Sequence, residues 1–253
     1  MPAPTPNLPE GIEACLFDLD GVLTETAKVH AKAWKQMFDS YLGDRAEREG
    51  ADFVAFDAAE DYNDYVDGKP RYDGVRSFLA SRVIELPEGT PEDPPEAETV
   101  CGLGNRKNRL VLELLRHDGV EAYPGSVRFL EAARDVGLRR AVVSSSANCQ
   151  EVLRAAGVEG LFEERIDGHI AARLGLKGKP APDTYLAGAR ALGVEPAAAT
   201  VFEDALSGVE SGRAGEFGCV VGVNRLGADH GEALREHGAT IVVSDLAELL
   251  TGR

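Results

Sequence analysis

The chain has 253 residues, 43% of them hydrophobic, and its formal net charge at pH 7 is −16. This length suits one large domain, or a domain with a second one inserted into it, and the apolar content is sufficient for a substantial core. The excess of acidic residues argues against nucleic acid or an anionic membrane surface as the main partner, because both carry negative charge. No run approaches the roughly 20 apolar residues of a membrane span. Residues 1–9 are rich in proline and predict a loose tail rather than a signal peptide.

The four cysteines, Cys15, Cys101, Cys149 and Cys219, form no C-x-x-C pair. Cys15 and Cys219 lie in apolar runs that are typical of strands, so we expect them to be core thiols. This use of cysteine fits a reducing compartment, and the sequence favours a cytoplasmic location.

The first predicted element is a buried strand, Glu13–Phe17. After it the sequence favours helices, which the spacing of apolar residues predicts over Thr26–Leu42, Asp73–Val83 and Asn105–His117. An acidic irregular stretch, Gly43–Asp67, and a proline-rich surface loop, Pro87–Glu98, lie between these helices. We therefore expect residues 26–119 to form an inserted helical cap that interrupts a core made of residues 1–25 and 120–253.

From residue 124 onward, short apolar runs alternate with amphipathic segments. The predicted strands are Arg140–Val143, Phe162–Ile166 (a strand or its lead-in), Ala199–Phe202, Cys219–Val223 and Thr240–Val243. The predicted helices are Val127–Val136, Asn148–Ala156, Pro182–Leu192, Gly208–Ala214 and Leu246–Leu250. This alternation indicates an α/β fold with a mostly parallel sheet that is covered on both faces.

Three of the predicted strands end in polar residues. Asp18 and Asp20 follow the first strand, Ser144–Ser146 follow the second, and Glu203 and Asp204 close a later one. Ligands of open α/β sheets bind beyond the carboxyl ends of the strands, so these groups should converge there if the strands are parallel neighbours. Lys179 adds a cation just before the helix at Pro182.

This combination suits attack on a phosphate monoester. A carboxylate that attacks a phosphate is an anion approaching an anion, and the repulsion must be neutralised by Mg²⁺ and a fixed cation. Asp18, Asp204 and Glu203 offer carboxylates for Mg²⁺, Lys179 offers the positive charge, and Ser144 offers a hydroxyl donor. Each motif alone has a simpler interpretation: an acidic turn, a serine-capped helix, a loop, or acids at a helix N-terminus.

The ordered set of motifs resembles that of the haloacid dehalogenase superfamily. The matching segments are Asp18-Leu19-Asp20-Gly21-Val22, Val143-Ser144, Lys179-Pro180-Ala181-Pro182-Asp183 and Glu203-Asp204. The resemblance implies a Rossmann-like core with an inserted helical cap domain. It also implies that Asp18 is a nucleophile that forms an aspartyl phosphate and that Asp20 is the general acid/base, with its backbone carbonyl on Mg²⁺. Asp204 would be a metal ligand, with Glu203 close to the metal shell.

Within this superfamily the chain is most similar to the β-phosphoglucomutase family. Matching positions that the resemblance assigns to substrate or phosphate are Thr26, His30, Arg71, Lys107, Asn108, Ser144, Ser146, Asn148 and Lys179. Trp34 also matches, but we expect it to be a core residue, and His30 is as readily explained by core packing as by a function. The family's phosphate-binding lysine between Ser146 and Asn148 is replaced by Ala147, so Arg71 must carry more of that charge. His117, His169, His230 and His237 match nothing and are expected at the surface.

The resemblance implies a mutase that interconverts β-glucose 1-phosphate and glucose 6-phosphate. We expect a monomer or weak homo-oligomer. A Mg²⁺-dependent sugar-phosphate phosphatase would share all four core motifs, and Ala147 slightly favours it. A non-catalytic sugar-phosphate sensor is a third possibility, but a sensor needs no nucleophile at Asp18. The identity of the sugar phosphate stays open at this point.

Overall fold

The computed structural model describes residues 4–251, apart from the side chain of Asp118. The chain divides into two compact units. One combines the chain up to Glu25 with the chain from Val120 onward, and the other is Thr26–Gly119.

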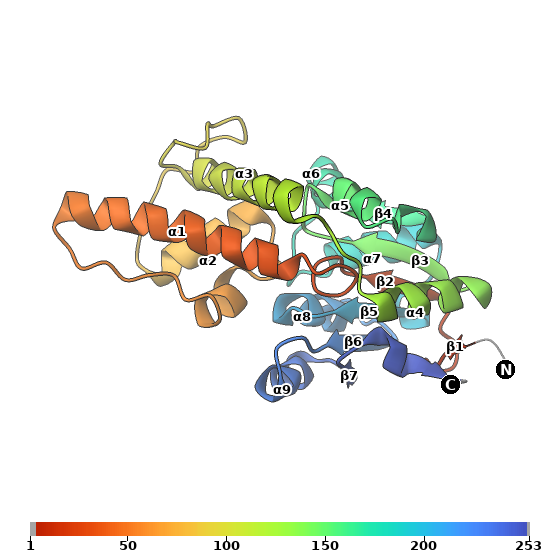
Figure 1. Ribbon diagram of the computed structural model, residues 1–253. Coiled ribbons are helices and arrows are strands. Elements are labelled where there is room, and N and C mark those ends of the chain that lie inside the picture. Colours follow the sequence, from red (N-terminus) through yellow and green to blue (C-terminus); the bar gives the residue numbers. More distant parts are fainter. Residues whose placement is uncertain (1–3, 252–253) are drawn as a thin grey trace. The chain divides into compact units, whose positions relative to one another are not determined.

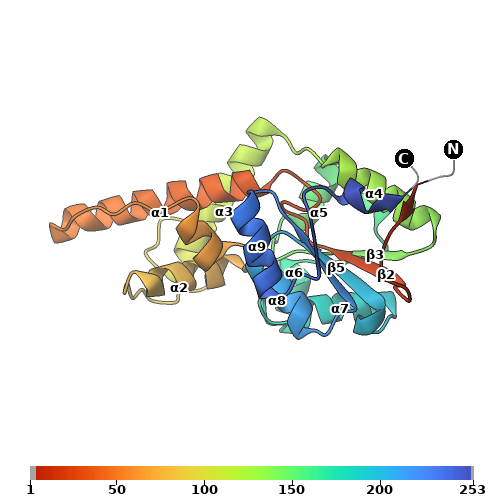
Figure 2. The same cartoon turned by 90° about the horizontal axis from the view of Figure 1, so that it is seen from below.

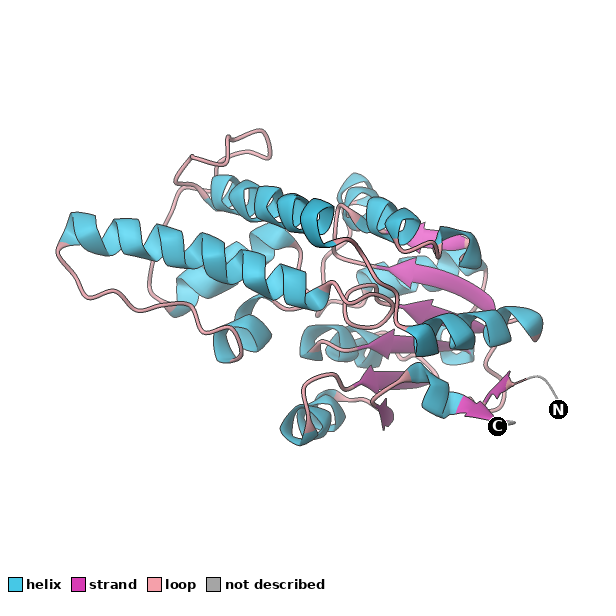
Figure 3. Cartoon of the chain, in the orientation of Figure 1, coloured by secondary structure: helices cyan, strands magenta, loops and turns pink. Residues whose placement is uncertain are grey.

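The first unit is built on six strands in the order β4-β3-β2-β5-β6-β7, and every neighbouring pair is parallel. Figures 1 and 3 show this sheet. The strands are β2 (Ala14–Phe17), β3 (Arg139–Val143), β4 (Glu164–Ile166), β5 (Ala199–Glu203), β6 (Cys219–Val223) and β7 (Ile241–Val243). The predicted α/β class with a Rossmann-like parallel sheet is confirmed.

Helices cover both faces of this sheet because successive strand residues point to opposite sides. Leu16 belongs to the cluster that is shared with α7 (Asp183–Leu192), α8 (Leu206–Ala214) and α9 (Ala228–His237). The next residue, Phe17, stacks on Phe202 with ring centroids 4.5 Å apart and meets Phe129 edge-on at 6.1 Å. Phe129 lies on α4 (Pro124–Asp135), which Figure 2 shows on the side of the sheet away from α7 and α8.

Several short elements complete the first unit. They are α5 (Cys149–Ala155), α6 (Gly168–Leu174), the 3₁₀ helices η2 (Glu159–Leu161), η3 (Pro196–Ala198) and η4 (Leu246–Leu249), and the antiparallel pair β1 (Thr5–Pro6) and β8 (Leu250–Thr251). The prediction of a loose N-terminal tail is therefore wrong for Thr5 and Pro6, and its first three residues lie outside the described range. The sequence patterns did not reveal α6 and α9, which are short, and α9 is largely charged.

The second unit consists of helices and loops, with no strand among its described residues (Figure 3). Its elements are α1 (Ala27–Glu49), a π-helical turn η1 (Tyr62–Val66), α2 (Arg71–Ser81) and α3 (Val100–Asp118). Its core contains the stacked, tilted and edge-on rings of Trp34, Phe38, Phe56 and Phe78, with neighbouring centroids 4.1–5.3 Å apart.

Two helices of this unit are longer than predicted. Helix α1 continues to Glu49 because an Arg45–Glu49 pair at 3.1 Å spans one turn, and Gly50 ends the helix with a φ of 63°. Helix α3 begins at Val100 because the Thr99 hydroxyl accepts a hydrogen bond from the Gly102 amide. The segment Pro87–Glu98 is a loop, as predicted.

The four cysteines are buried free thiols, and Cys15 and Cys219 lie on β2 and β6 as predicted. Burial raises the pKa of Cys15, which keeps this thiol protonated and unreactive. Among the described helices, none is both long and apolar enough to cross a membrane.

Candidate active site

The parallel register of three strands brings the predicted polar groups to one edge of the sheet. Phe17 on β2 lies opposite Val142 on β3 and Phe202 on β5. The strands therefore end at nearly the same level, and Asp18, which follows β2, and Glu203, the last residue of β5, both contact Lys179 there.

Lys179 connects these strand ends. Its ammonium nitrogen Nζ lies 2.5 Å from Asp18 Oδ1, 2.5 Å from Glu203 Oε1 and 3.3 Å from the Val143 carbonyl. Lys179 is only 2% exposed, and Glu203 is fully buried. Tyr185, which sequence reasoning did not select, donates its hydroxyl proton to Glu203 at 3.0 Å and places its ring 4.9 Å from the lysine. The three N–H donors of the Lys179 ammonium group are thus used by Asp18, Glu203 and the Val143 carbonyl, all within a buried site.

Burial and charge act against each other here. Burial raises the pKa of Asp18 well above its usual value, the Glu203 and Asp20 carboxylates add to this, and Lys179 opposes it. Burial alone would lower the pKa of Lys179, but Asp18 and Glu203 outweigh that effect and raise the pKa, so the lysine stays protonated. One cation therefore serves several carboxylates, and a further cation would favour the ionised form of Asp18.

The carboxylates of Asp18, Glu203 and Asp204 form a group that could hold such a cation. One carboxylate oxygen from each of the three residues lies within 4.8 Å of the other two. Mg²⁺ prefers one or two carboxylates together with water and substrate oxygens, so an all-oxygen cluster at two strand ends fits that ion. The half-buried Asp20 side chain is outside this group, which is compatible with a role in proton transfer.

The turn after Asp20 is tight because Gly21 adopts a φ of 82°. Its amide donates to the Thr24 carbonyl at 2.8 Å. A side-chain carbon at position 21 would lie 1.8 Å from Asp204 Oδ2. Only glycine combines this conformation with this approach to the acidic group.

We expect Gly21→Ala to lower turnover about a hundredfold, because displacement of a reacting or metal-binding group by an ångström has effects of this size. Gly11→Ala is the matched control, since Gly11 has a φ of 85° but nothing within 4 Å of the added carbon. Turnover and the Mg²⁺ concentration for half-maximal rate would be measured for both variants. Equal behaviour of the two would show that the close approach to Asp204 is unimportant.

Two residues after β6 support the same turns and were not found from the sequence. Arg225 Nε donates to the Gly21 carbonyl at 2.9 Å, and its guanidinium lies 3.7 Å from the centre of the Tyr123 ring. His230 Nε2 lies 2.8 Å from the Asp204 carbonyl. The prediction that His230 is a surface residue is wrong, because the side chain is half-buried and burial lowers its pKa. Neither residue stands in a motif, so the sequence carries no local signal for these contacts.

The serines after β3 form successive turns. The Ser144 hydroxyl accepts from the Ser146 amide at 3.1 Å, and the Ser146 hydroxyl accepts from the Asn148 amide at 3.1 Å. As the simpler interpretation of this run expects, the hydroxyl oxygens of Ser144 and Ser146 accept backbone hydrogen bonds within turns. An accepting hydroxyl still carries a proton that it can donate, so the turn is compatible with phosphate binding.

The remaining predicted residues lie at the start of and within the second unit. Lys107, which is 5% exposed, has Nζ 3.0 Å from His30 Nδ1 and 4.7 Å from the centre of the Trp34 ring. An ammonium group can only donate, so His30 accepts through Nδ1. Asn108 follows Lys107 on α3, and the buried Thr26 precedes α1. Arg71 begins α2, where its guanidinium donates to the Tyr72 hydroxyl at 3.0 Å.

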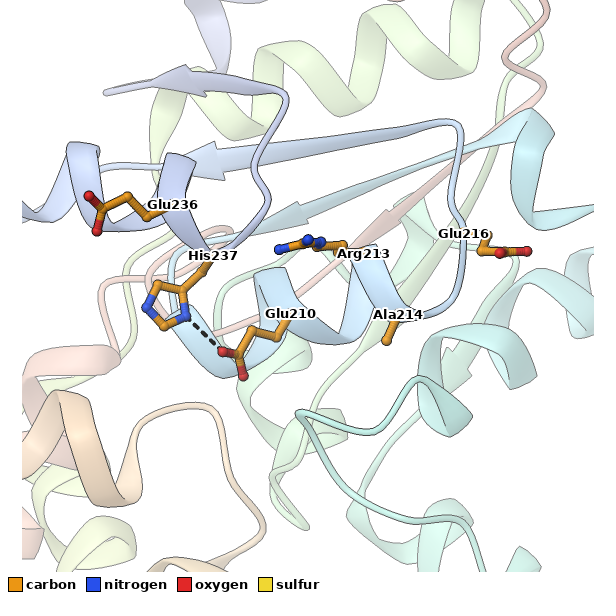
Figure 4. Close-up of a pocket in the computed structure, with 6 residues that line it drawn as sticks. All are labelled: Glu210, Arg213, Ala214, Glu216, Glu236 and His237. Atoms are coloured by element: carbon orange, nitrogen blue, oxygen red, sulfur yellow. Dashed lines mark hydrogen bonds and ion pairs between the residues drawn. The ribbon is translucent and has the colours of Figure 1, made fainter.

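A surface pocket between α8 and α9 includes none of these residues (Figure 4). It is lined by Glu210, Arg213, Ala214, Glu216, Glu236 and His237, and its His237–Glu210 contact measures 2.7 Å. None of these side chains belongs to the acidic group at the strand ends.

Comparison with known proteins agrees with the motifs. The model of the family described as haloacid dehalogenase-like hydrolase matches residues 12–215. A β-phosphoglucomutase of Mycobacterium tuberculosis is 60% identical over 245 residues, which cover 96% of this chain and 94% of the relative. Hexitol phosphatase A of Escherichia coli is 30% identical over 83% of this chain and 82% of that protein.

The crystal structure of a β-phosphoglucomutase from Clostridium difficile has the same fold. It superposes with a TM-score of 0.70 at 25% identity, and the match covers 94% of this chain and 93% of the other. Sequence, fold and the ordered polar strand ends all agree. The chain therefore belongs to the haloacid dehalogenase-like hydrolase family and, within it, to the group of the β-phosphoglucomutases.

Proposed function

We propose that the protein is a Mg²⁺-dependent mutase that interconverts β-glucose 1-phosphate and glucose 6-phosphate. The observation that carries this proposal is the buried contact of Asp18 with Lys179, beside Glu203 and Asp204, in a chain 60% identical to a protein named β-phosphoglucomutase. A nucleophilic carboxylate held against a fixed cation at the end of a core strand has a clear use in phosphoryl transfer.

In this mechanism Asp18 carries a phosphoryl group as an acyl phosphate. A sugar hydroxyl gives its proton to Asp20 and attacks the phosphorus, and the bond between phosphorus and the Asp18 oxygen breaks. The resulting sugar bisphosphate turns over, the Asp18 carboxylate attacks the other phosphorus, and Asp20 returns the proton to the departing sugar oxygen. Lys179 keeps its positive charge throughout and holds Asp18 in place.

Asp18 and Asp204, with Glu203 close by and the Asp20 carbonyl, are the groups that we assign to Mg²⁺. When bound, the ion supplies positive charge to the phosphate oxygens. We expect the purified enzyme to lose most of its turnover in excess EDTA and to regain it when Mg²⁺ is restored. Full turnover in the presence of the chelator would exclude this assignment.

A mutase must also hold the phosphate that is not being transferred, and we assign this task to Arg71 on the second unit, acting as a cap. Ser144 would donate to the phosphate under transfer, and Ser146 and Asn148 to the other. We assign the hinge to Thr26, and contacts with the sugar phosphate to His30, Lys107 and Asn108. Because Ala147 replaces the family's lysine, Arg71 is the strongest cation left for the second phosphate, and its guanidinium can bind it by paired hydrogen bonds.

We expect Arg71→Ala to lose most mutase turnover, with a cost of roughly 2–4 kcal/mol for a lost desolvated charge contact. Hydrolysis of acetyl phosphate should survive, because Asp18, Asp20 and Lys179 are unchanged. The control is Arg109→Ala on α3, which removes an exposed arginine paired with Glu96 at 2.7 Å. If both activities of Arg71→Ala fell together, Arg71 would support the fold instead, and if neither fell, the second phosphate would be held elsewhere.

A phosphatase of sugar phosphates on the same scaffold is the second candidate. The similarity to a protein named hexitol phosphatase and the presence of Ala147 favour it. A phosphatase transfers the phosphoryl group of Asp18 to water, so it needs no grip on a second phosphate. The two candidates therefore differ in product: the phosphatase releases inorganic phosphate, and the mutase forms glucose 6-phosphate.

A further inference from the structure

Arg71 is held by a neutral partner in a strongly acidic protein. Its guanidinium donates to the Tyr72 hydroxyl, and its central carbon lies 4.9 Å from the centre of the Tyr72 ring. Within residues 4–251 the structure gives Arg71 no carboxylate partner, although Asp73 follows closely on α2. That carboxylate pairs with Arg76, which also binds Glu88. The nearby carboxylates of Asp73 and Glu88 are thus used by Arg76, and among the described residues none pairs with Arg71.

Tyr72 is fixed in turn by α3. Its hydroxyl donates to Asn105 Oδ1 at 3.0 Å. Its ring lies against Gly104, where a side-chain carbon would come within 2.6 Å of the ring. Glycine at position 104 is what allows the ring to lie this close to the helix.

The side-chain amide of Asn105 cannot flip without losing hydrogen bonds. Asn105 Nδ2 donates to the Pro91 carbonyl at 3.0 Å and to the Asp93 carbonyl at 2.8 Å. Both amide protons are used by the loop Pro87–Glu98, so the amide oxygen faces Tyr72. This fixes the direction of the chain of bonds: Arg71 donates to Tyr72, and Tyr72 donates to Asn105.

The loop that holds Asn105 is itself ordered around Asp93. The Asp93 carboxylate accepts from the Thr99 hydroxyl at 2.6 Å and from the Thr90 hydroxyl at 3.1 Å. The Thr99 bond lowers the pKa of Asp93, and Thr99 also caps α3. The proline-rich loop is therefore bonded to the start of the helix that carries Asn105.

We propose that Tyr72 and Asn105 are positioning residues that hold the Arg71 guanidinium ready for an anionic group, with the loop Pro87–Glu98 as their base. The inference rests on the proposed function in one respect: the anion is taken to be the second phosphate of the sugar bisphosphate. The acidic, proline-rich loop then has a role in the enzyme, which is to aim a cation without neutralising it.

The test is a double-mutant cycle. Tyr72→Phe and Asn105→Ala are made in the natural chain and in the Arg71→Ala variant, and total turnover of β-glucose 1-phosphate is measured as glucose 6-phosphate plus inorganic phosphate. We expect each change to lower kcat/KM about tenfold in the natural chain, because each removes one hydrogen bond from the series that positions the Arg71 guanidinium. Neither change should have a further effect when Arg71 is absent. Hydrolysis of acetyl phosphate should be unchanged. Glu96→Gln, which breaks an exposed ion pair of the same loop, should behave as the natural chain.

The inference would be overturned if the two changes lowered kcat/KM equally with and without Arg71, because they would then act through the fold. It would also be overturned if they had no effect in the natural chain. Tyr72→Phe removes a single oxygen and keeps the ring, so it carries the test even if Asn105→Ala does not fold. Failure of the proposed function would give a different result. The natural chain would then release only inorganic phosphate, and the variants could still be compared by their total turnover.

Discussion

Asp18→Asn is expected to lower turnover at least about a thousandfold, because the substitution keeps the shape of the side chain but removes the anionic nucleophile. The position is only 7% exposed and lies 2.5 Å from Lys179, so water cannot readily take over the role of the carboxylate. Turnover of β-glucose 1-phosphate and of acetyl phosphate would both be measured, since both require the aspartyl phosphate.

The matched control is Asp135→Asn, at an exposed carboxylate that pairs with Arg134 at 3.1 Å. It makes the same chemical change at the surface and should leave both activities intact. Near-normal activity of Asp18→Asn would rule out an aspartyl phosphate at this position.

Lys179→Met is expected to abolish detectable turnover and to destabilise the fold by about 3–5 kcal/mol, the cost of leaving buried charge without its partner. The ammonium group is almost fully buried between Asp18 and Glu203, so its removal leaves two carboxylates close together. The free energy of unfolding in urea at pH 7, measured without Mg²⁺, reports the stability term separately from the activity.

A second variant separates the two effects of Lys179. Addition of Asp18→Asn to Lys179→Met removes one of the two uncompensated charges, while Glu203 keeps its bonds from the Tyr185 hydroxyl and the Ala205 amide, both at 3.0 Å. The double variant should recover part of the lost stability and none of the activity. If it were less stable than Lys179→Met alone, charge balance would not be the reason for the buried lysine.

The strands of the first unit can be predicted because each one is a short apolar run in the sequence. A buried strand such as β2 is a continuous apolar run, and the polar residue that follows marks where the strand ends, so the sequence alone predicts Asp18 at a strand end. The same reasoning applies to Ser144 and Glu203, and the parallel order of β3, β2 and β5 brings these ends together.

What the sequence could not show are contacts that depend on how distant segments meet. His230 and Arg225 lie far along the chain from the turns that they support, and neither residue type is unusual at its position. Tyr185 lies on α7 among apolar residues, a pattern that suggests an ordinary core tyrosine, yet its hydroxyl lies 3.0 Å from Glu203.

The second unit was predicted least well because its helix ends depend on capping and on charge pairs. Residues 43–49 are polar and are typical of an irregular stretch, although an i,i+4 pair and a C-terminal glycine extend α1 through them. The bonds from Asn105 to the loop Pro87–Glu98 likewise join residues whose types suggest only a turn and a surface helix.

The most direct test of the account is the product formed from β-glucose 1-phosphate. The purified protein would be supplied with Mg²⁺ and with acetyl phosphate to load Asp18. Glucose 6-phosphate, measured by a coupled dehydrogenase, and inorganic phosphate would be followed in the same reaction. We expect glucose 6-phosphate to form faster than the substrate loses inorganic phosphate, and α-glucose 1-phosphate to be a poor substitute. Release of inorganic phosphate from β-glucose 1-phosphate without glucose 6-phosphate would contradict this expectation and identify a phosphatase.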